Sequence, residues 1–339
     1  MIALVGRDAR RRIRLAARVI ADSGARARVR GVTATRSVAA HLSRLDRERL
    51  SIGGFVVALT VFAGARFVAA SPWDIPAFDA YAYWSTRDGL DYATAAEGRT
   101  GAYLYSPAFA QLIAPLTVLP LATFAGIWTL ALALPLVWLA GRYALPLALL
   151  PPVAMSIGLG QLDIAFAAVA VVGLRWPWAW ALPLLTKVTP GIGILWFLVR
   201  GEWRAVSIAV GATLAIGLGS AILDPAGWAG WFGMLARLEF PVLGGGLIFL
   251  PVDLWIRLPV SVAVVTWGAR TDRQWTIPVA MVLALPTIFV NSPTILVALV
   301  PLLAAGPRTP AGRWLRGARS RRDRAPGWAT SIRRTIDRS

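Results

Sequence analysis

The stretch LATFAGIWTLALALPLVWLA, residues Leu121–Ala140, contains twenty residues and no charged side chain. A helix of about 20 apolar residues crosses the hydrocarbon core of a bilayer, so this stretch predicts a membrane-spanning helix. Similar apolar runs recur from Ser51 to Ala305, and 57% of the 339 residues are hydrophobic while only 15% are charged. These runs are continuous, whereas strands of a membrane β-barrel alternate between apolar and polar residues. The sequence therefore predicts an all-α polytopic membrane protein.

The order of the apolar runs predicts a bundle of about ten transmembrane helices. The first is Ser51–Ala70, and residues 71–106 follow as a long outer loop with five acidic residues and two Arg. Residues 224–257 are interpreted as a second outer loop with interfacial helices. Several runs contain only 11 to 15 residues, so a count of roughly eight to twelve stays open. Besides Leu121–Ala140, the later runs are 107–120, 145–157, 162–174, 176–199 with an interruption at TKVTPG (186–191), 205–223, 258–268, 277–290 and 293–305.

The formal net charge of +18 is concentrated at the two ends of the chain. Residues 1–50 contain 13 Arg and four acidic residues, and residues 306–339 contain 10 Arg and two Asp. Basic segments that flank a neutral apolar body are typical of the cytoplasmic parts of membrane proteins, and they attract anionic membrane lipids. We therefore expect a cytoplasmic N-terminal extension over 1–50, a membrane body over 51–305 and a cytoplasmic tail over 306–339. Nucleic acid is not expected as a partner.

The composition excludes several kinds of catalytic site. The chain has no Cys, and its single His is His41 in the basic N-terminal segment, so thiolate and histidine chemistry is excluded from the membrane body. Asp74, Asp79, Asp88 and Asp91 could supply oxygen ligands to Mg²⁺, but their spacing matches no recognised metal-binding loop. No cofactor is therefore assigned, and a divalent cation such as Mg²⁺ is left open.

The first outer loop contains FDAYAYWSTRDGLDY, residues 78–92, in which three Asp stand among five aromatic residues. Asp79 is surrounded in the sequence by Phe78, Tyr81 and Trp84. Partly apolar surroundings raise the pKa of a carboxylate and suit it to act as a general base. The alternative is an aromatic belt at the membrane interface with an incidental acid.

Three polar residues lie within or at the mouth of apolar runs. Gln161 and Asp163 belong to GLGQLD, residues 158–163, and Lys187 is the only lysine of the chain. Polar groups at membrane depth tend to face a cavity and to mark function, and a phosphate is a natural partner for a lone cation. The alternatives are a polar turn between two helices and a lysine that snorkels or pairs with Asp163. The side of the membrane on which GLGQLD lies depends on the helix count.

Five segments follow one another in a characteristic order: FDAYAYW (78–84), YLYSPAFAQLIAPLTVLP (103–120), IW (127–128), GQLD (160–163) and LLTKVTPGIGILWFLVRGEWR (184–204). In this order they resemble glycosyltransferase family 87, a polyprenol-phosphate-dependent family of the multi-spanning GT-C superfamily that includes actinobacterial mannosyltransferases. The resemblance runs from about Ser51 to Leu223 and is looser beyond. YSP at 105–107 stands where the family usually has Tyr-Pro-Pro, and the membrane body is short for the family.

The resemblance implies a GT-C-like bundle and roles for individual residues. Asp79, or Asp74 as the fallback, would be the catalytic base that deprotonates an acceptor hydroxyl. Lys187 or Arg66 would stabilise the leaving phosphate. The other expected substrate-binding residues are Gln161, Asp163, Tyr81, Tyr83, Trp84 and Tyr105.

The expected reaction moves a hexose, in the first place mannose, or a pentose from polyprenyl phosphate to a lipid or glycan acceptor with inversion. It would take place at the outer face of a bacterial plasma membrane, in the synthesis of cell-envelope glycolipids. The rival interpretation is a multi-spanning transporter or flippase of lipid-linked sugars, and a third is an inactive scaffold. The aromatic, acidic outer loop directly after the first span favours the enzyme.

Overall fold

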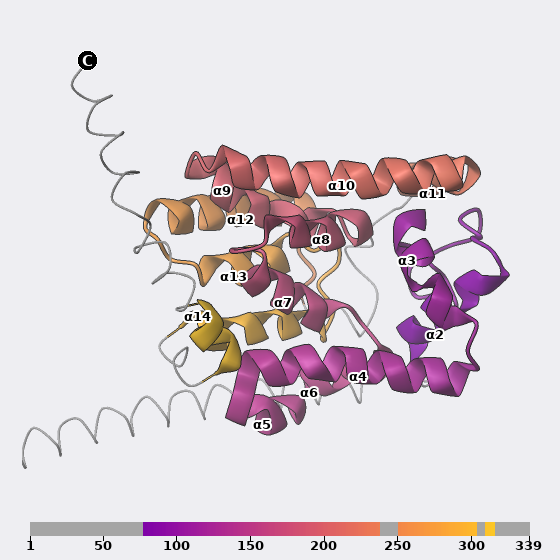
Figure 1. Ribbon diagram of the computed structural model, residues 1–339, viewed down its shortest axis with the longest axis horizontal. Helices are drawn as coiled ribbons and strands as arrows, with labels where there is room; N and C mark the ends of the chain where they lie inside the picture. Colours follow the sequence, from indigo (N-terminus) through magenta and orange to yellow (C-terminus); the bar gives the residue numbers. More distant parts are fainter. Residues whose placement is uncertain (1–76, 238–249, 304–308, 316–339) are drawn as a thin grey trace, which may run out of the picture. The chain divides into compact units, whose positions relative to one another are not determined.

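The computed structural model describes residues 77–237, 250–303 and 309–315, and Figure 1 shows their arrangement. All of them belong to one of two units of the chain, Phe62–Ser339. The N-terminal extension, the expected span Ser51–Ala70, and the candidate residues Arg66 and Asp74 lie outside the described residues. Those expectations stay predictions.

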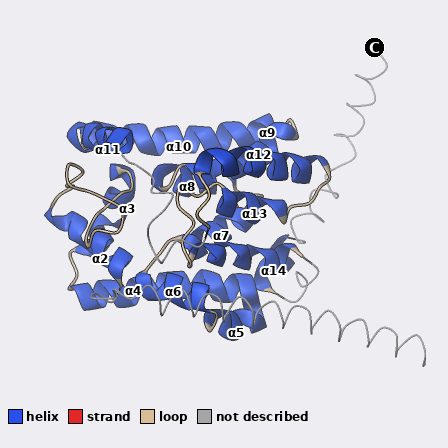
Figure 2. Cartoon of the chain, turned by 180° about the vertical axis from the view of Figure 1, so that it is seen from behind, coloured by secondary structure: helices blue, strands red, loops and turns tan. Residues whose placement is uncertain are grey.

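Every regular element in the described ranges is a helix (Figure 2), as the apolar runs predict. The first group is α2 Phe78–Trp84, η1 Ser85–Asp88, α3 Pro107–Thr117, α4 Leu121–Ala140, η2 Gly141–Tyr143, α5 Ala144–Ala148, α6 Pro151–Leu159 and α7 Asp163–Val172. The second group is η3 Pro177–Trp180, α8 Ala181–Thr186, η4 Thr189–Ile194, α9 Leu195–Val199, α10 Trp203–Leu223, α11 Pro225–Arg237, α12 Leu254–Arg270, α13 Thr276–Leu283, η5 Ser292–Ala298 and α14 Leu299–Leu302.

Helix α4 has the bounds expected from the sequence and presents two different faces. Phe124, Trp128 and Leu132 recur every fourth residue and are buried, because positions four apart share one face of a helix. Leu130 and Leu134 are 63% and 70% exposed on another face. A large exposed apolar surface of this kind is stable in lipid and not in water.

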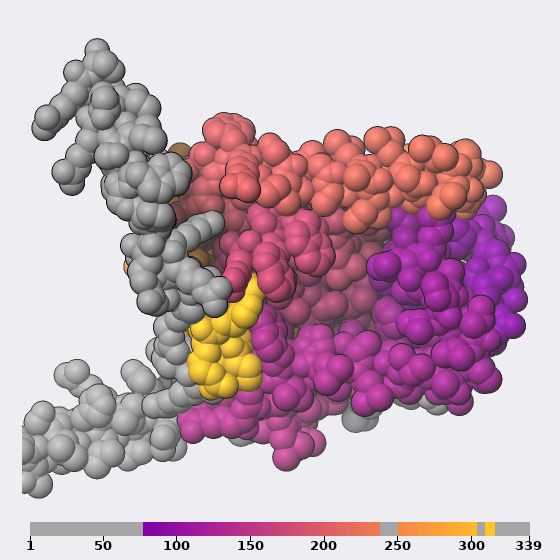
Figure 3. Space-filling model, viewed as in Figure 1, coloured from indigo at the N-terminus to yellow at the C-terminus, as the bar shows by residue number. Residues whose placement is uncertain are grey.

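Helix α10 is the second long apolar helix. It and the continuous stretch 121–148 are each long and apolar enough to cross a membrane. Only 11% of its most apolar stretch is buried, and its surface forms the upper edge of the space-filling view in Figure 3. Figures 1 and 2 place α4 and α10 along opposite edges, with α7, α8 and α13 between them. Two spans are therefore clear among the described residues, and the expected count of about ten stays a prediction.

The GLGQLD segment forms a sharp bend between α6 and α7. Together the two helices are apolar enough for one span, but their axes differ by 104°. Gly160 ends α6 with a φ of 81°, and a Cβ atom there would lie 2.7 Å from Cβ of Ala80 in α2. The indole nitrogen of Trp128 donates to the Gly160 carbonyl at 2.8 Å. The bend thus packs closely between α2 and α4 and brings the start of α7 to α2.

The expected interruption at TKVTPG is also present. Helix α8 ends at Thr186, and Val188 has a φ of 56° before η4 begins. Positive φ is strained for a β-branched residue, and such strain gathers at functional sites. Lys187 therefore lies at a break between helices, and its side chain extends to Gln161 in the bend after α6.

The stretch 224–257, expected as a second outer loop with interfacial helices, contains helix in its described residues. Helix α11 follows α10 after a single residue, Asp224, and α12 already begins at Leu254. The guanidinium of Arg257 is buried and donates to the carbonyl oxygens of Val252, Leu283, Leu285 and Pro286 at 2.6–2.7 Å. These bonds fix the chain just after α13, a few residues before Asn291.

Replacing Arg257 by Met should therefore lower the free energy of unfolding by about 3 kcal/mol, because buried carbonyl groups would lose charged donors. Chemical unfolding of the purified protein in detergent would measure the change. Arg270→Met is the matched control, since Arg270 is exposed on the same helix, and its effect should stay within about 0.5 kcal/mol. Equal effects of the two substitutions would contradict this role of Arg257.

Candidate active site

The helices enclose a pocket of about 210 Å³. Its wall comes from α2, the loop at 96–105, the end of α6 with the following bend, Lys187, and the segment 289–291. Segments far apart in the sequence therefore meet here. The charged and polar residues of the lining are Asp79, Tyr83, Glu97, Arg99, Tyr105, Gln161, Lys187 and Asn291.

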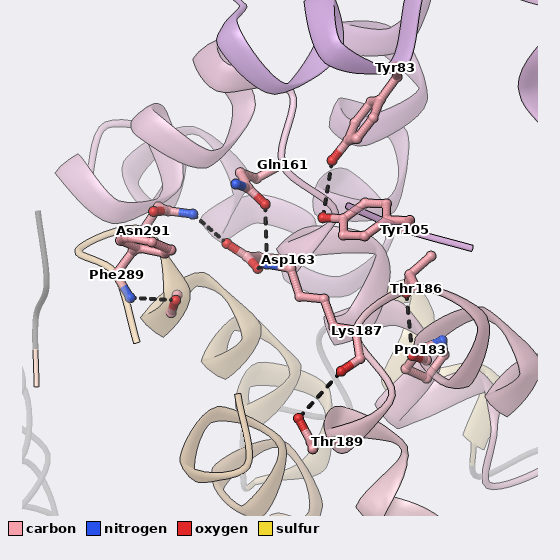
Figure 4. A network of polar contacts seen from close by, with 11 residues as sticks. Tyr83, Tyr105, Gln161, Asp163, Pro183, Thr186, Lys187, Thr189, Phe289 and Asn291 are labelled. Atoms are coloured by element: carbon pink, nitrogen blue, oxygen red, sulfur yellow. Dashed lines mark hydrogen bonds and ion pairs between the residues drawn. The ribbon is translucent and has the colours of Figure 1, made fainter. Parts of the chain in front are cut away.

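A buried ion pair lies at one side of this pocket (Figure 4). Nζ of Lys187 is 3.7 Å from Oδ1 of Asp163, and their side chains are 16% and 0% exposed. The amide nitrogen of Asn291 donates to Oδ2 of Asp163 at 2.7 Å. Lys187 also donates to Oε1 of Gln161 at 3.3 Å. The pairing of Lys187 with Asp163, which the sequence offers as an alternative to a phosphate partner, is therefore present, and Lys187 lines the pocket.

Asp79 lies in the first turn of α2 and is partly exposed toward the pocket. The charges of Lys187 and Asp163 act on it, and Gln161 lines the same pocket. Helix α2 belongs to the expected outer loop, outside the spanning segments. Burial raises the pKa of the Asp79 carboxyl to about 7, against the opposing influence of Lys187. A carboxyl with this pKa is suited to take up a proton near neutral pH.

The four aromatic candidates separate into two groups. Tyr83 and Tyr105 line the pocket, and the hydroxyl of Tyr83 donates to that of Tyr105 at 3.2 Å. Trp84 instead donates from its indole nitrogen to the Leu119 carbonyl at 2.7 Å, and Tyr81 lies beside it with ring centroids 6.1 Å apart. Neither Tyr81 nor Trp84 is part of the pocket wall. The helical period of α2 explains this difference, because residues three apart, such as 81 and 84, lie on the same face of a helix.

Three further residues of the site were not predicted. Asn291 interrupts the apolar C-terminal runs, so the argument that selected Gln161 also selects it. Glu97 accepts a hydrogen bond from Thr287 at 3.2 Å, and burial raises the pKa of its carboxyl. Arg99 follows two residues later on the same loop and lines the pocket. The predicted outer loop is rich in charge, so its sequence gives no signal that selects Glu97 or Arg99.

The acids considered for Mg²⁺ do not assemble in the described part of the chain. Asp88 lies beside Arg87 with a separation of 3.7 Å, and Asp91 accepts hydrogen bonds from Ala93 and Thr94. Within the described ranges no group of three or more Asp, Glu or His side chains could hold a metal ion. A second, larger cleft of about 670 Å³ lies beside α3 and α11, and it contains none of the predicted site residues.

Comparison with known proteins gives one family. Residues 103–331 match the model of glycosyltransferase family 87, while neither the curated proteins nor the solved structures gave a match. The matched region includes Gln161, Asp163, Lys187 and Asn291, and it begins after Asp79. It covers more than half of the chain and agrees with the helical, apolar architecture. The chain therefore belongs to glycosyltransferase family 87.

Proposed function

We propose that the protein moves a hexose, in the first place mannose, or a pentose from polyprenyl phosphate to a lipid or glycan acceptor. The family itself indicates a glycosyltransferase with a sugar donor and an acceptor. A lipid-linked donor is supported by the two helices of the described residues that are long and apolar enough to cross a membrane. It is also supported by the described elements, which include no strand followed by a glycine-rich loop for a nucleotide.

The observation that carries the proposal is that a proton-accepting carboxyl and a positive charge lie in one small pocket. Asp79 supplies a carboxyl that can accept a proton, and Lys187 supplies a positive charge. Gln161 accepts a hydrogen bond from Lys187 and lines the same pocket as Asp79. Tyr83 and Tyr105 offer hydroxyl groups and ring faces to a sugar.

The proposed reaction is a single displacement. Asp79 takes the proton of an acceptor hydroxyl while the oxygen attacks the anomeric carbon of the donor sugar. The bond between that carbon and the phosphate oxygen breaks, and the polyprenyl phosphate leaves with the bonding electrons. The configuration inverts, and the growing negative charge on the phosphate is stabilised by nearby cations.

The proposed place of this reaction is the outer face of a bacterial plasma membrane. Asp79 belongs to the expected outer loop, and both basic ends are expected in the cytoplasm. A lipid donor and a lipid or glycan acceptor would then meet at the interface, in the synthesis of the cell envelope.

Asp79→Asn should reduce turnover by about 10²- to 10⁴-fold, because the general base would be lost. The assay uses the full chain in detergent, synthetic polyprenyl-phosphate mannose and crude membrane lipid as acceptor, and it follows release of polyprenyl phosphate. Asp88→Asn is the control, because this exposed side chain of the same loop should be dispensable. Undiminished turnover in a folded Asp79→Asn protein would rule out the base assignment. No release from mannose, glucose or arabinofuranose donors would instead favour transport of lipid-linked sugars, which flipping in liposomes would test.

The pH dependence of turnover should report on the same carboxyl. A base works in its deprotonated form, so the rate should rise with pH and level off above a pKa of about 7 for Asp79. Two units below that pKa, roughly one hundredth of the carboxyl is ionised, and the rate should fall in proportion. A rate that stays constant between pH 5 and pH 8 would contradict the assignment.

Lys187→Met should remove activity and also destabilise the protein, because Asp163 would remain buried without its cation. The expected loss in the free energy of unfolding is about 3–5 kcal/mol. Adding Asp163→Asn should recover most of the stability without recovering turnover, since no positive charge returns. Thermal unfolding and the transfer assay on the same samples separate the two effects. A double variant with wild-type turnover would show that Lys187 serves only to pair with Asp163.

A further inference from the structure

Two cations line the pocket among the described residues, and their surroundings differ. Lys187 faces the buried carboxylate of Asp163 at 3.7 Å, so much of its charge is already compensated. Arg99 is exposed, and none of the described carboxylates lies within 4.0 Å of its guanidinium. Arg99 is therefore the lining cation with charge left for a ligand.

The loop around Arg99 is held in place by its own turns and by one distant contact. Gly98 and Gly101 have φ values of 81° and 76°, which glycine adopts without strain. Glu97 accepts a hydrogen bond from Thr287, which precedes the wall segment 289–291. One guanidinium nitrogen of Arg99 donates to the Thr94 carbonyl at 2.8 Å. A guanidinium has five N–H donors in a fixed fork, so this bond orients the group and leaves other donors for a ligand.

The size of the pocket limits which part of a lipid-linked sugar it can hold. Its volume of about 210 Å³ is below the roughly 300–1,000 Å³ of sites that enclose drug-sized ligands. A sugar ring with its phosphate and lipid would exceed this space. The sugar would therefore occupy the pocket, while the phosphate stays at the mouth and the lipid chain stays in the membrane.

We propose that Arg99 binds the phosphate of the lipid-linked donor at the mouth of this pocket. The assignment rests on the proposed function and makes Arg99, together with Lys187, the group that meets the leaving phosphate. A guanidinium binds phosphate through two parallel hydrogen bonds and keeps its charge at any working pH. Arg99 would thus fix the donor with its anomeric carbon turned inward, toward Asp79.

The test measures binding of farnesyl phosphate to the purified full chain in neutral detergent by calorimetry, with farnesol as the uncharged counterpart. Arg99→Gln should weaken farnesyl phosphate binding about tenfold or more, because a charged hydrogen bond is lost, and should leave farnesol binding unchanged. Arg99→Lys should give an intermediate affinity, because lysine lacks the fork. Arg87→Gln is the matched control, since Arg87 lies on the same outer loop but away from this pocket.

The outcomes distinguish this inference from the proposed function. If wild type binds farnesyl phosphate and Arg99→Gln binds it equally well, the role of Arg99 is wrong while the lipid-linked donor stands. If wild type binds no farnesyl phosphate, both fail. If inorganic phosphate alone binds with the same affinity and the same dependence on Arg99, the site is one for free anions, and the assignment to a lipid donor is overturned.

Discussion

The arrangement of the candidate site depends on the buried ion pair between Lys187 and Asp163. Two charges at this depth cost several kcal/mol to remove from water unless each finds partners. Asp163 finds Lys187 and Asn291, and Lys187 also finds Gln161. Because these residues come from the bend after α6, the break after α8 and the segment before η5, satisfying the pair requires three separate parts of the chain to meet. The pocket is the space beside that meeting point.

Much of the fold could be predicted from local sequence, and particular elements show where local sequence is not sufficient. The bounds of α4 could be predicted because its apolar run is uninterrupted, and TKVTPG marked a break because it contains a proline and a lone cation. For residues 224–257 the sequence predicts an outer loop with interfacial helices, and helices α11 and α12 are present there, but their bounds could not be predicted. Their Trp and Gly content resembles an interface, and packing against neighbouring helices decides their conformation, which a local pattern does not contain.

The candidate site could be predicted for residues that are unusual in their surroundings. Gln161, Asp163 and Lys187 stand out as polar groups in apolar runs, and the structure brings them together. Glu97 and Arg99 do not stand out, because a hydrated loop is full of charges and only its folding over the pocket selects them. Tyr81 and Trp84 were predicted for the site but are not part of the pocket wall, since a cluster of aromatic residues in the sequence does not indicate which ring faces the pocket. Asp74 and Arg66 lie outside the described residues and stay predictions.

The pocket is built from two parts of the chain, one inside the region that matches the family model and one before it. The ion pair and Asn291 lie within the part that matches the family model, while Asp79, Glu97 and Arg99 precede it. Gly160 joins the two parts, because its missing side chain lets α2 rest on the bend. A side chain at position 160 would push α2 away from the bend, so the joining of the two parts of the pocket depends on this glycine.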